Sequence, residues 1–374
     1  MKTKIDEPFC ELLRIALGIS QEFPYILKPQ EWRQLYTMAH RQTLLGVTYT
    51  AITRLPKESQ PPFRQTLLWA RDAEAIRGKN RLMNQEAARY TQLFAERGFK
   101  SAILKGQANA RLYPDPFSRL PGDIDIWVPG GYEKVLNLLQ DLKIPNLEHL
   151  EPEFHDIEFS NENKIHIEVH HRPSSTSLEI RLNRTNEEIQ KILLSELENV
   201  TLTPEGFYTP SIRFALLMQL PHLYKHALFS GVSLRQYMDY YMLLMHSTEE
   251  DRRFTWDFVK KIGMEKGCAA IMDVLEHVFK LPQEKMLCEP NKFYGKILYT
   301  TTITEGDFGA RLIYQNKHKL KYFFKFIIYN IRLFPMAPLY ISLKVIKYWS
   351  WKRHTLKIIR QISSIFHKKS LSKN

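Results

Sequence analysis

Two carboxylates within an alternating apolar segment offer the clearest chemistry in this chain. Residues 122–128 read Gly-Asp-Ile-Asp-Ile-Trp-Val, a strand pattern. Because successive side chains on a strand point to opposite faces, Asp123 and Asp125 share one face with Trp127, while the aliphatic residues face the core. Neighbouring carboxylates repel unless a cation joins them, and Mg²⁺ takes one or two carboxylates together with phosphates. The segment predicts a metal-dependent phosphoryl or nucleotidyl transfer site, although alternating acids also occur in ordinary half-exposed sheets.

A second alternating segment places another carboxylate on a strand face together with two histidines. Residues 165–170 read Ile-His-Ile-Glu-Val-His, so His166, Glu168 and His170 share the polar side. The preceding segment also has strand composition and ends in polar residues that are typical of a turn. A hairpin over 154–170 would therefore bring Glu168 toward the two aspartates as a third carboxylate.

A glycine between a predicted strand and a predicted helix lies upstream of the aspartates. Residues 100–104 form an apolar strand pattern, Lys105 and Gly106 follow, and a helical pattern runs over 108–113. Glycine at such a turn lets the backbone approach a phosphate, and the free N–H groups of a helix N-terminus favour anions. The order of these segments predicts a phosphate contact at Lys105 and Gly106, whereas a purely structural glycine would follow the same pattern.

At these residues the chain resembles the uncharacterised bacterial nucleotidyltransferase family within the DNA polymerase β superfamily. The resemblance covers roughly residues 30–280 and is sharpest over 103–128. It rests on five motifs: Leu104-Lys105-Gly106, Leu112-Tyr113-Pro114, Arg119, Gly122-Asp123-Ile124-Asp125 and Glu168-Val169-His170. It implies an α+β fold, with a small mixed sheet and helices packed on it, flanked by N- and C-terminal helical regions.

The resemblance also implies roles for individual residues. Asp123 and Asp125 would bind two divalent ions, Mg²⁺ or Mn²⁺, and Glu168 would bind one of them and help to activate the attacking hydroxyl. Nucleotide contacts are implied for Lys105, Gly106, Gln107 and Arg119. The superfamily usually has Gly or Ser after the glycine of its first motif, whereas Gln107 follows Gly106 here.

A polar stretch downstream resembles the helical region that follows the catalytic core in that family. His222 and His226 lie four residues apart, as do Arg235 and Asp239, so each pair shares a helix face. We interpret the second pair as a structural ion pair, with Arg235 as a further candidate nucleotide contact. Histidines at this spacing can chelate zinc, yet no cysteine or third close histidine accompanies them. The candidate cleft residues are His166, His170, His222 and His226.

The predicted function is transfer of a nucleotidyl group from a nucleoside triphosphate to a hydroxyl acceptor that the sequence does not identify. One alternative is a non-catalytic nucleotide-binding regulatory protein, such as an antitoxin on the same fold, which the retained acids argue against. Another is a metal-dependent phosphohydrolase built on His166, His170, His171 and the aspartates. Strand alternation directs His171 away from His170, which disfavours this site.

The helical and strand patterns divide the chain into four regions. We predict an N-terminal helical cap over 1–97, a catalytic core over 98–210, a helical domain over 211–307 and a basic, aromatic tail over 308–374. Three widely spaced cysteines predict neither a disulfide framework nor a C-x-x-C metal site. The N-terminal residues lack the apolar stretch of a signal peptide, so we expect a cytoplasmic protein.

The tail carries the charge imbalance of the chain. It holds fifteen Lys or Arg residues and no Asp or Glu, whereas the whole chain has 53 basic and 40 acidic residues, so residues 1–307 are nearly neutral. Its longest uncharged run, 333–343, contains two prolines and is too short to span a bilayer. Interleaved aromatic and basic residues suit an anionic membrane surface. We favour a peripheral position on the inner membrane face over packing of the tail on the body and over nucleic-acid binding.

We predict that deleting residues 308–374 abolishes association with anionic membranes and leaves the catalytic core folded. The reason is that the positive excess lies in the tail while every candidate site residue lies upstream. Flotation with anionic and neutral liposomes at low and high salt measures this, and the full-length chain should bind only anionic lipid and lose binding with salt. A full-length protein that floats with neither lipid, or an insoluble truncated protein, would show that the tail is a structural subdomain.

Overall fold

The computed structural model describes residues 4–174, 184–229 and 231–306, together with Ile328, Asn330, Ile331, Leu333 and Phe334. Residues 1–315 form one compact unit and residues 316–374 another. The predicted membrane-binding tail therefore lies outside the described residues, apart from those five positions. No helix in the described part of the chain has both the length and the apolar character needed to cross a membrane.

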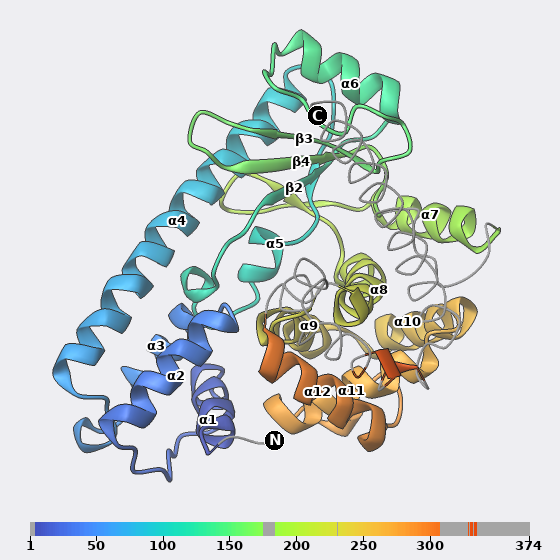
Figure 1. Ribbon diagram of the computed structural model, residues 1–374. Coiled ribbons are helices and arrows are strands. Elements are labelled where there is room, and N and C mark those ends of the chain that lie inside the picture. The colour runs from blue at the N-terminus through green and yellow to red at the C-terminus, as the bar shows by residue number, and fades with distance from the viewer. Residues whose placement is uncertain are drawn as a thin grey trace, which may run out of the picture. The chain divides into compact units, whose positions relative to one another are not determined.

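A four-stranded mixed sheet lies in the larger unit (Figure 1). In spatial order its strands are β1 (Ala102–Ile103), β2 (Ile124–Trp127), β4 (His166–His170) and β3 (Asp156–Ser160). Strand β2 runs antiparallel to β1 and parallel to β4, and β3 forms the predicted antiparallel hairpin with β4. A separate hairpin consists of β5 (Thr201–Leu202) and β6 (Tyr208–Thr209). The prediction of an α+β fold with a small mixed sheet is confirmed.

The described residues also form twelve α-helices. They are α1 (Asp6–Ala16), α2 (Pro29–Arg41), α3 (Leu45–Ile52), α4 (Phe63–Ala95), α5 (Gln107–Ala110), α6 (Tyr132–Asp141), α7 (Arg184–Glu196), α8 (Ile212–Phe229), α9 (Leu234–His246), α10 (Glu249–Ile262), α11 (Glu265–Phe279) and α12 (Lys292–Glu305). Four of them precede the sheet and five follow the β5–β6 hairpin, so helical regions flank the strands as predicted.

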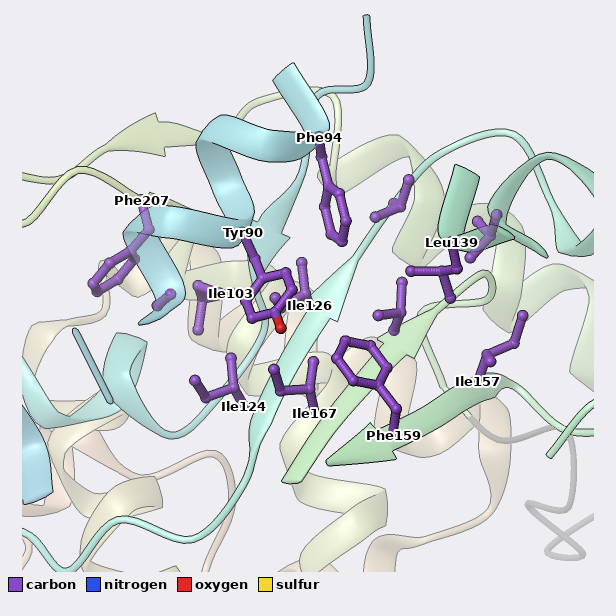
Figure 2. Close-up of a cluster of buried hydrophobic side chains, with 14 of the residues drawn as sticks. Tyr90, Phe94, Ile103, Ile124, Ile126, Leu139, Ile157, Phe159, Ile167 and Phe207 are labelled. Atoms are coloured by element: carbon purple, nitrogen blue, oxygen red, sulfur yellow. The ribbon is translucent and has the colours of Figure 1, made fainter. Parts of the chain in front are cut away.

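The apolar face of the sheet packs against α4 and α6 (Figure 2). Every second residue of β2 and β4 belongs to this core, as strand alternation predicts. The core includes Tyr90, Phe94, Ile103, Ile124, Ile126, Leu139, Ile157, Phe159 and Ile167, all nearly fully buried. Burial of one such side chain stabilises the fold by about 1.5–3 kcal/mol. The core therefore determines which strand face is buried and leaves the acidic residues on the other face.

Helix α4 joins the sheet to the N-terminal helices. It contains 33 residues, which corresponds to about 50 Å at 1.5 Å per residue. Its C-terminal half contributes Tyr90 and Phe94 to the sheet core, while its N-terminal half packs on α2 and α3. There the ring of Trp69 lies 5.2 Å from that of Tyr36. One continuous helix thus connects the predicted cap with the predicted catalytic core.

Buried polar side chains tie the N-terminal helices to the C-terminal ones. Arg14 Nε donates to the carbonyl of Val278 in the last turn of α11 at 2.9 Å. Gln42 Nε2 donates to the carbonyl of Thr302 at 2.9 Å, and its Oε1 accepts from the backbone N–H of Leu234 at 2.9 Å. Because backbone groups at helix ends have no partner within their own helix, these side chains satisfy groups that would otherwise be buried unpaired.

A buried ion pair joins the loop before β2 to α9. Arg119 Nε and Nη2 donate to the two carboxylate oxygens of Asp239 at 2.7 and 2.8 Å, and the Tyr113 hydroxyl donates to Oδ1 at 2.7 Å. The sequence analysis assigned Asp239 to Arg235 on the same helix face. The structure adds a second partner: Arg119 binds Asp239 through two parallel hydrogen bonds, while Arg235 Nη1 donates to the carbonyl of Leu120 at 2.8 Å and its charge also lowers the pKa of Asp239.

We predict that Asp239→Asn lowers the free energy of unfolding by about 3–5 kcal/mol, because the buried guanidinium of Arg119 loses its charge partner. Glu250→Gln is the matched control. Glu250 accepts from Arg213 at 3.0 Å on the surface, and its loss should cost no more than about 1 kcal/mol. Urea unfolding followed by circular dichroism measures both variants, and equal losses would contradict the prediction.

Candidate active site

The polar face of the sheet lines a cavity of about 650 Å³. Further lining residues come from helices α5, α8 and α9, from the segments before β2 and β3, from the turns after β1 and β4, and from Thr43. The cavity brings together ten of the predicted site residues: Lys105, Gly106, Arg119, Asp123, Asp125, Glu168, His170, His222, His226 and Arg235. These residues come from positions up to 130 apart in the sequence, so the site exists only in the folded chain.

Two predicted site residues, Gln107 and His166, do not line this cavity. Gln107 is 1% exposed, and its Nε2 donates to Asn80 Oδ1 on α4 at 3.2 Å, because the first residue of α5 turns toward that helix. His166 lies at the start of β4, where its Nε2 is 3.2 Å from Glu158 Oε2. Gln107 is therefore separated from the rest of the predicted site, whereas His166 stays beside it, since its Nε2 is also 3.9 Å from Glu168 Oε1.

Strand pairing places two carboxylates side by side. Asp125 on β2 and Glu168 on β4 are direct partners in the parallel register. His170, the next residue on that face, has its Nε2 3.1 Å from Asp125 Oδ1 and 3.5 Å from Glu168 Oε2. One donor atom from each of these three residues lies within 4.8 Å of the others. Donors this close can share a single cation.

Asp125 has one oxygen available for a further ligand. Its Oδ1 lies 3.0 Å from Lys105 Nζ and 3.1 Å from His170 Nε2, whereas its Oδ2 is buried and makes no hydrogen bond. A buried carboxylate oxygen without a partner costs free energy unless a donor or a cation satisfies it. Oxygen donors are the ligands that Mg²⁺ prefers, so the residues present fit a divalent metal ion.

Asp123 lines the same cavity but stands apart from this donor group. It precedes β2, which begins at Ile124, and no close group of three metal-binding residues in the described part of the chain includes it. Its charge still acts on the group. Burial lowers the pKa of Lys105, but the carboxylates of Asp125, Asp123 and Glu168 outweigh burial and raise that pKa above its ordinary value. All three predicted acids thus surround one lysine.

Electrostatic pairing favours the charged forms of His170 and Glu168. Burial lowers the pKa of His170, but its contacts with Asp125 and Glu168 raise it to about 9. For Glu168, burial raises the pKa, and the contact with His170 together with the charge of Lys105 brings it below its ordinary value. One buried and one partly buried carboxylate therefore lie beside two basic side chains of the same chain, Lys105 and His170.

Gly106 adopts a backbone conformation that other residues rarely take. Its φ is 63° and its ψ is −104°, so any side chain here would be strained. The turn brings Lys105 beside Asp125. The helix that follows, α5, has only four residues, which is shorter than the helix predicted over 108–113. The backbone conformation of the turn thus explains why glycine occupies position 106. Because α5 is short, its N-terminus attracts a phosphate less strongly than the predicted longer helix would.

Two neutral histidines of α8 also line the cavity. The rings of His222 and His226 lie 4.4 Å apart. Burial and the nearby charge of Lys105 lower the pKa of His226 to about 4, and burial together with Lys105 holds that of His222 well below its ordinary value. Neither histidine belongs to a close metal-binding group among the described residues. Both histidines therefore line the cavity as neutral side chains.

The sequence analysis missed the acidic residues of β3. Asp156 and Glu158 line the cavity beside β4, together with His149 and His155. The segment 155–159, His-Asp-Ile-Glu-Phe, alternates in the same way as the strand of Asp123 and Asp125. The alternation rule would therefore have found both carboxylates, but the sequence analysis treats this segment only as the first arm of a hairpin.

Comparison with known proteins identifies the family. A family model described as an uncharacterised nucleotidyltransferase matches residues 28–280, which is more than half of the chain and includes every predicted site residue. No curated protein matches. The match spans the sheet, the cavity and the helices α8 and α9 that line it. The chain therefore belongs to this family of uncharacterised nucleotidyltransferases.

Proposed function

We propose that this protein transfers a nucleotidyl group from a nucleoside triphosphate to an acceptor hydroxyl with the help of Mg²⁺ or Mn²⁺. The observation that carries the proposal is the pairing of Asp125 with Glu168 across parallel strands, where a buried Asp125 oxygen has no hydrogen bond. Membership of a nucleotidyltransferase family supports the same reaction class. We also propose that the sheet is related to that of the DNA polymerase β superfamily of nucleotidyltransferases.

In this proposal Asp123, Asp125 and Glu168 hold the divalent ions. When bound, such ions neutralise charge on the transferred phosphoryl group and favour ionisation of the acceptor hydroxyl. Lys105 and His170 both contact Asp125 Oδ1, so they orient the carboxylate with Oδ2 available. Hydrogen bonds of this kind to a metal-binding carboxylate fix its orientation.

Lys105 and Arg235 supply positive charge for the phosphates. The Lys105 side chain is 24% exposed and lines the cavity, so its ammonium can exchange Asp125 for a phosphate of the nucleotide. Arg235 also lines the cavity. The two Arg119 donors that face Asp239, Nε and Nη2, are both used in hydrogen bonds to that carboxylate. We therefore assign Arg119 to positioning α9 rather than to holding the nucleotide.

The two alternative functions predict different chemistry. A regulatory protein would bind a nucleotide without releasing pyrophosphate. A phosphohydrolase of the kind outlined above needs His171 in the site, but the ring of His171 lies 5.3 Å from that of Tyr132 and does not line the cavity. The geometry therefore favours the transferase.

A label on the α-phosphate tests the proposal. Each of the four nucleoside triphosphates, labelled at this position, is incubated with the protein, Mg²⁺ and separate fractions of small molecules, lipids, RNA and protein as acceptors. We expect label in one fraction together with released pyrophosphate. Labelled nucleoside diphosphate or monophosphate without incorporation would favour a hydrolase. Binding of the triphosphate without release of pyrophosphate would favour a regulatory protein.

We predict that Asp123→Asn and Asp125→Asn remove the thermal stabilisation that Mg²⁺ plus nucleotide gives the wild type. A ligand at 100 times its Kd contributes about 2.7 kcal/mol. Asp257→Asn, which alters an exposed carboxylate on α10, should keep the full effect. Without ligand, only Asp125→Asn should be less stable, because Lys105 and His170 share its Oδ1. If both aspartate variants keep the wild-type response, the metal assignment is wrong.

We predict that Glu168→Gln reduces turnover by about 10²-fold or more, while nucleotide affinity changes less. Glu168 is paired with Asp125, so in the proposal it helps to hold a metal ion and to activate the acceptor hydroxyl rather than to bind the triphosphate. Glu162→Gln, at the exposed tip of the same hairpin, is the control and should behave as the wild type. Pyrophosphate release and nucleotide titration measure the two effects, and a Glu168→Gln variant with normal turnover would remove this role.

A further inference from the structure

A second group of ligating side chains lies at the β3 edge of the cavity. His149, in the segment between α6 and β3, and Asp156 and Glu158 on β3 each offer a donor atom within 4.8 Å of the others. His149 Nδ1 is 2.8 Å from Glu158 Oε1 and 3.7 Å from Asp156 Oδ1. All three residues line the cavity, and none belongs to the donor group of Asp125.

Two atoms of this group are buried without a hydrogen bond. Both His149 Nδ1 and Asp156 Oδ1 lack a hydrogen-bond partner, and the Asp156 side chain is only 3% exposed. The short approach of His149 to Glu158 thus lacks the alignment that a hydrogen bond requires. Leaving such atoms unpaired is unfavourable, and a cation between them would satisfy both.

The separations between these atoms fit a small metal ion. Ligands at about 2.1 Å from a tetrahedral metal lie about 3.4 Å from one another. The observed distances from His149 Nδ1, 2.8 and 3.7 Å, lie on either side of this value. The ring of His149 is stacked on Phe154, with centroids 4.1 Å apart and an interplanar angle of 8°, which restrains its orientation.

The donor set indicates which ion would bind. Mg²⁺ prefers oxygen ligands alone, whereas an imidazole combined with carboxylates suits Zn²⁺ and related transition metals. Three protein ligands leave a fourth position open for water or for an oxygen atom of a molecule in the cavity. The group at Asp125 has the same ligand types, but His170 Nε2 already contacts Asp125 Oδ1 and Glu168 Oε2, whereas His149 Nδ1 makes no hydrogen bond and is available to a metal ion.

We propose that His149, Asp156 and Glu158 form a second divalent-metal site of the zinc type on the wall of the same cavity. His155 Nδ1 contacts the same Asp156 oxygen at 3.1 Å and belongs to a different close group with His170. His149 is preferred because its Nδ1 is itself buried and unpaired, and because its group is separate from the Asp125 cluster. The site does not depend on the proposed nucleotidyl transfer.

Titration of the full-length protein with Zn²⁺ in excess Mg²⁺, followed by calorimetry, tests this site. We expect one Zn²⁺ per chain in the wild type and at least about tenfold weaker binding in His149→Gln and Glu158→Gln. Co²⁺ in place of Zn²⁺ should give the visible absorption of a four-coordinate site in the wild type and not in these two variants. Both altered side chains are partly exposed, so the metal-free variants should melt as the wild type does.

Two control variants separate the neighbouring groups. His155→Gln changes the adjacent cavity histidine, and Asp125→Asn changes the group of Asp125, Glu168 and His170; both variants should bind Zn²⁺ as tightly as the wild type. The proposal is overturned by a wild type that binds no Zn²⁺ or by unchanged binding in His149→Gln and Glu158→Gln. Loss of binding in His155→Gln or in Asp125→Asn also overturns it, because the ion would then belong to another group.

Discussion

A fully buried carboxylate, Asp125, sets the condition on which the rest of the site depends. The register between β2 and β4 puts the partly buried Glu168 beside it, and two such neighbouring charges are unfavourable unless cations neutralise them. Lys105 and His170 do so, and both contact the same oxygen of Asp125. The turn at Gly106, which follows Lys105 and holds it beside Asp125, is thus as necessary to the site as the acids themselves. A divalent ion that binds here has to compete with these two internal cations.

The hydrophobic core on the other sheet face makes this concentration of charge unavoidable. A shift of one residue in any strand would exchange its core and polar faces, so the packing of the apolar residues fixes where the acids lie. On β3 the same rule sets Glu158 opposite Glu168 in the antiparallel register. Burial and the charges of Asp156 and Glu168 raise the pKa of Glu158. Histidines that lie between these carboxylates reduce the repulsion among the negative charges. The polar face formed by β2, β4 and β3 is therefore suited to binding cations.

Helices from distant parts of the chain complete the cavity. The Arg119–Asp239 pair fixes α9 against the loop that leads into β2, and Gln42 bonds backbone groups of α9 and α12. Because each of these side chains is buried and bonded to an element far away in the sequence, the cap, the sheet and the helical region support one another within residues 1–315. The geometry of the proposed reaction centre therefore depends on helices that carry none of its acids.

The sequence by itself determined the local features of this protein. Alternation identified the strands and placed Asp125 and Glu168 on polar faces, because side-chain direction on a strand follows from its two-residue period. Motifs around Gly106 indicated the family in the same local way. Tertiary structure alone decided the partners: that Arg119 rather than Arg235 binds Asp239 through two hydrogen bonds, and that Gln107 turns toward α4. These outcomes depend on strand order and helix packing, which bring together residues up to 120 positions apart, and no local pattern specifies such contacts.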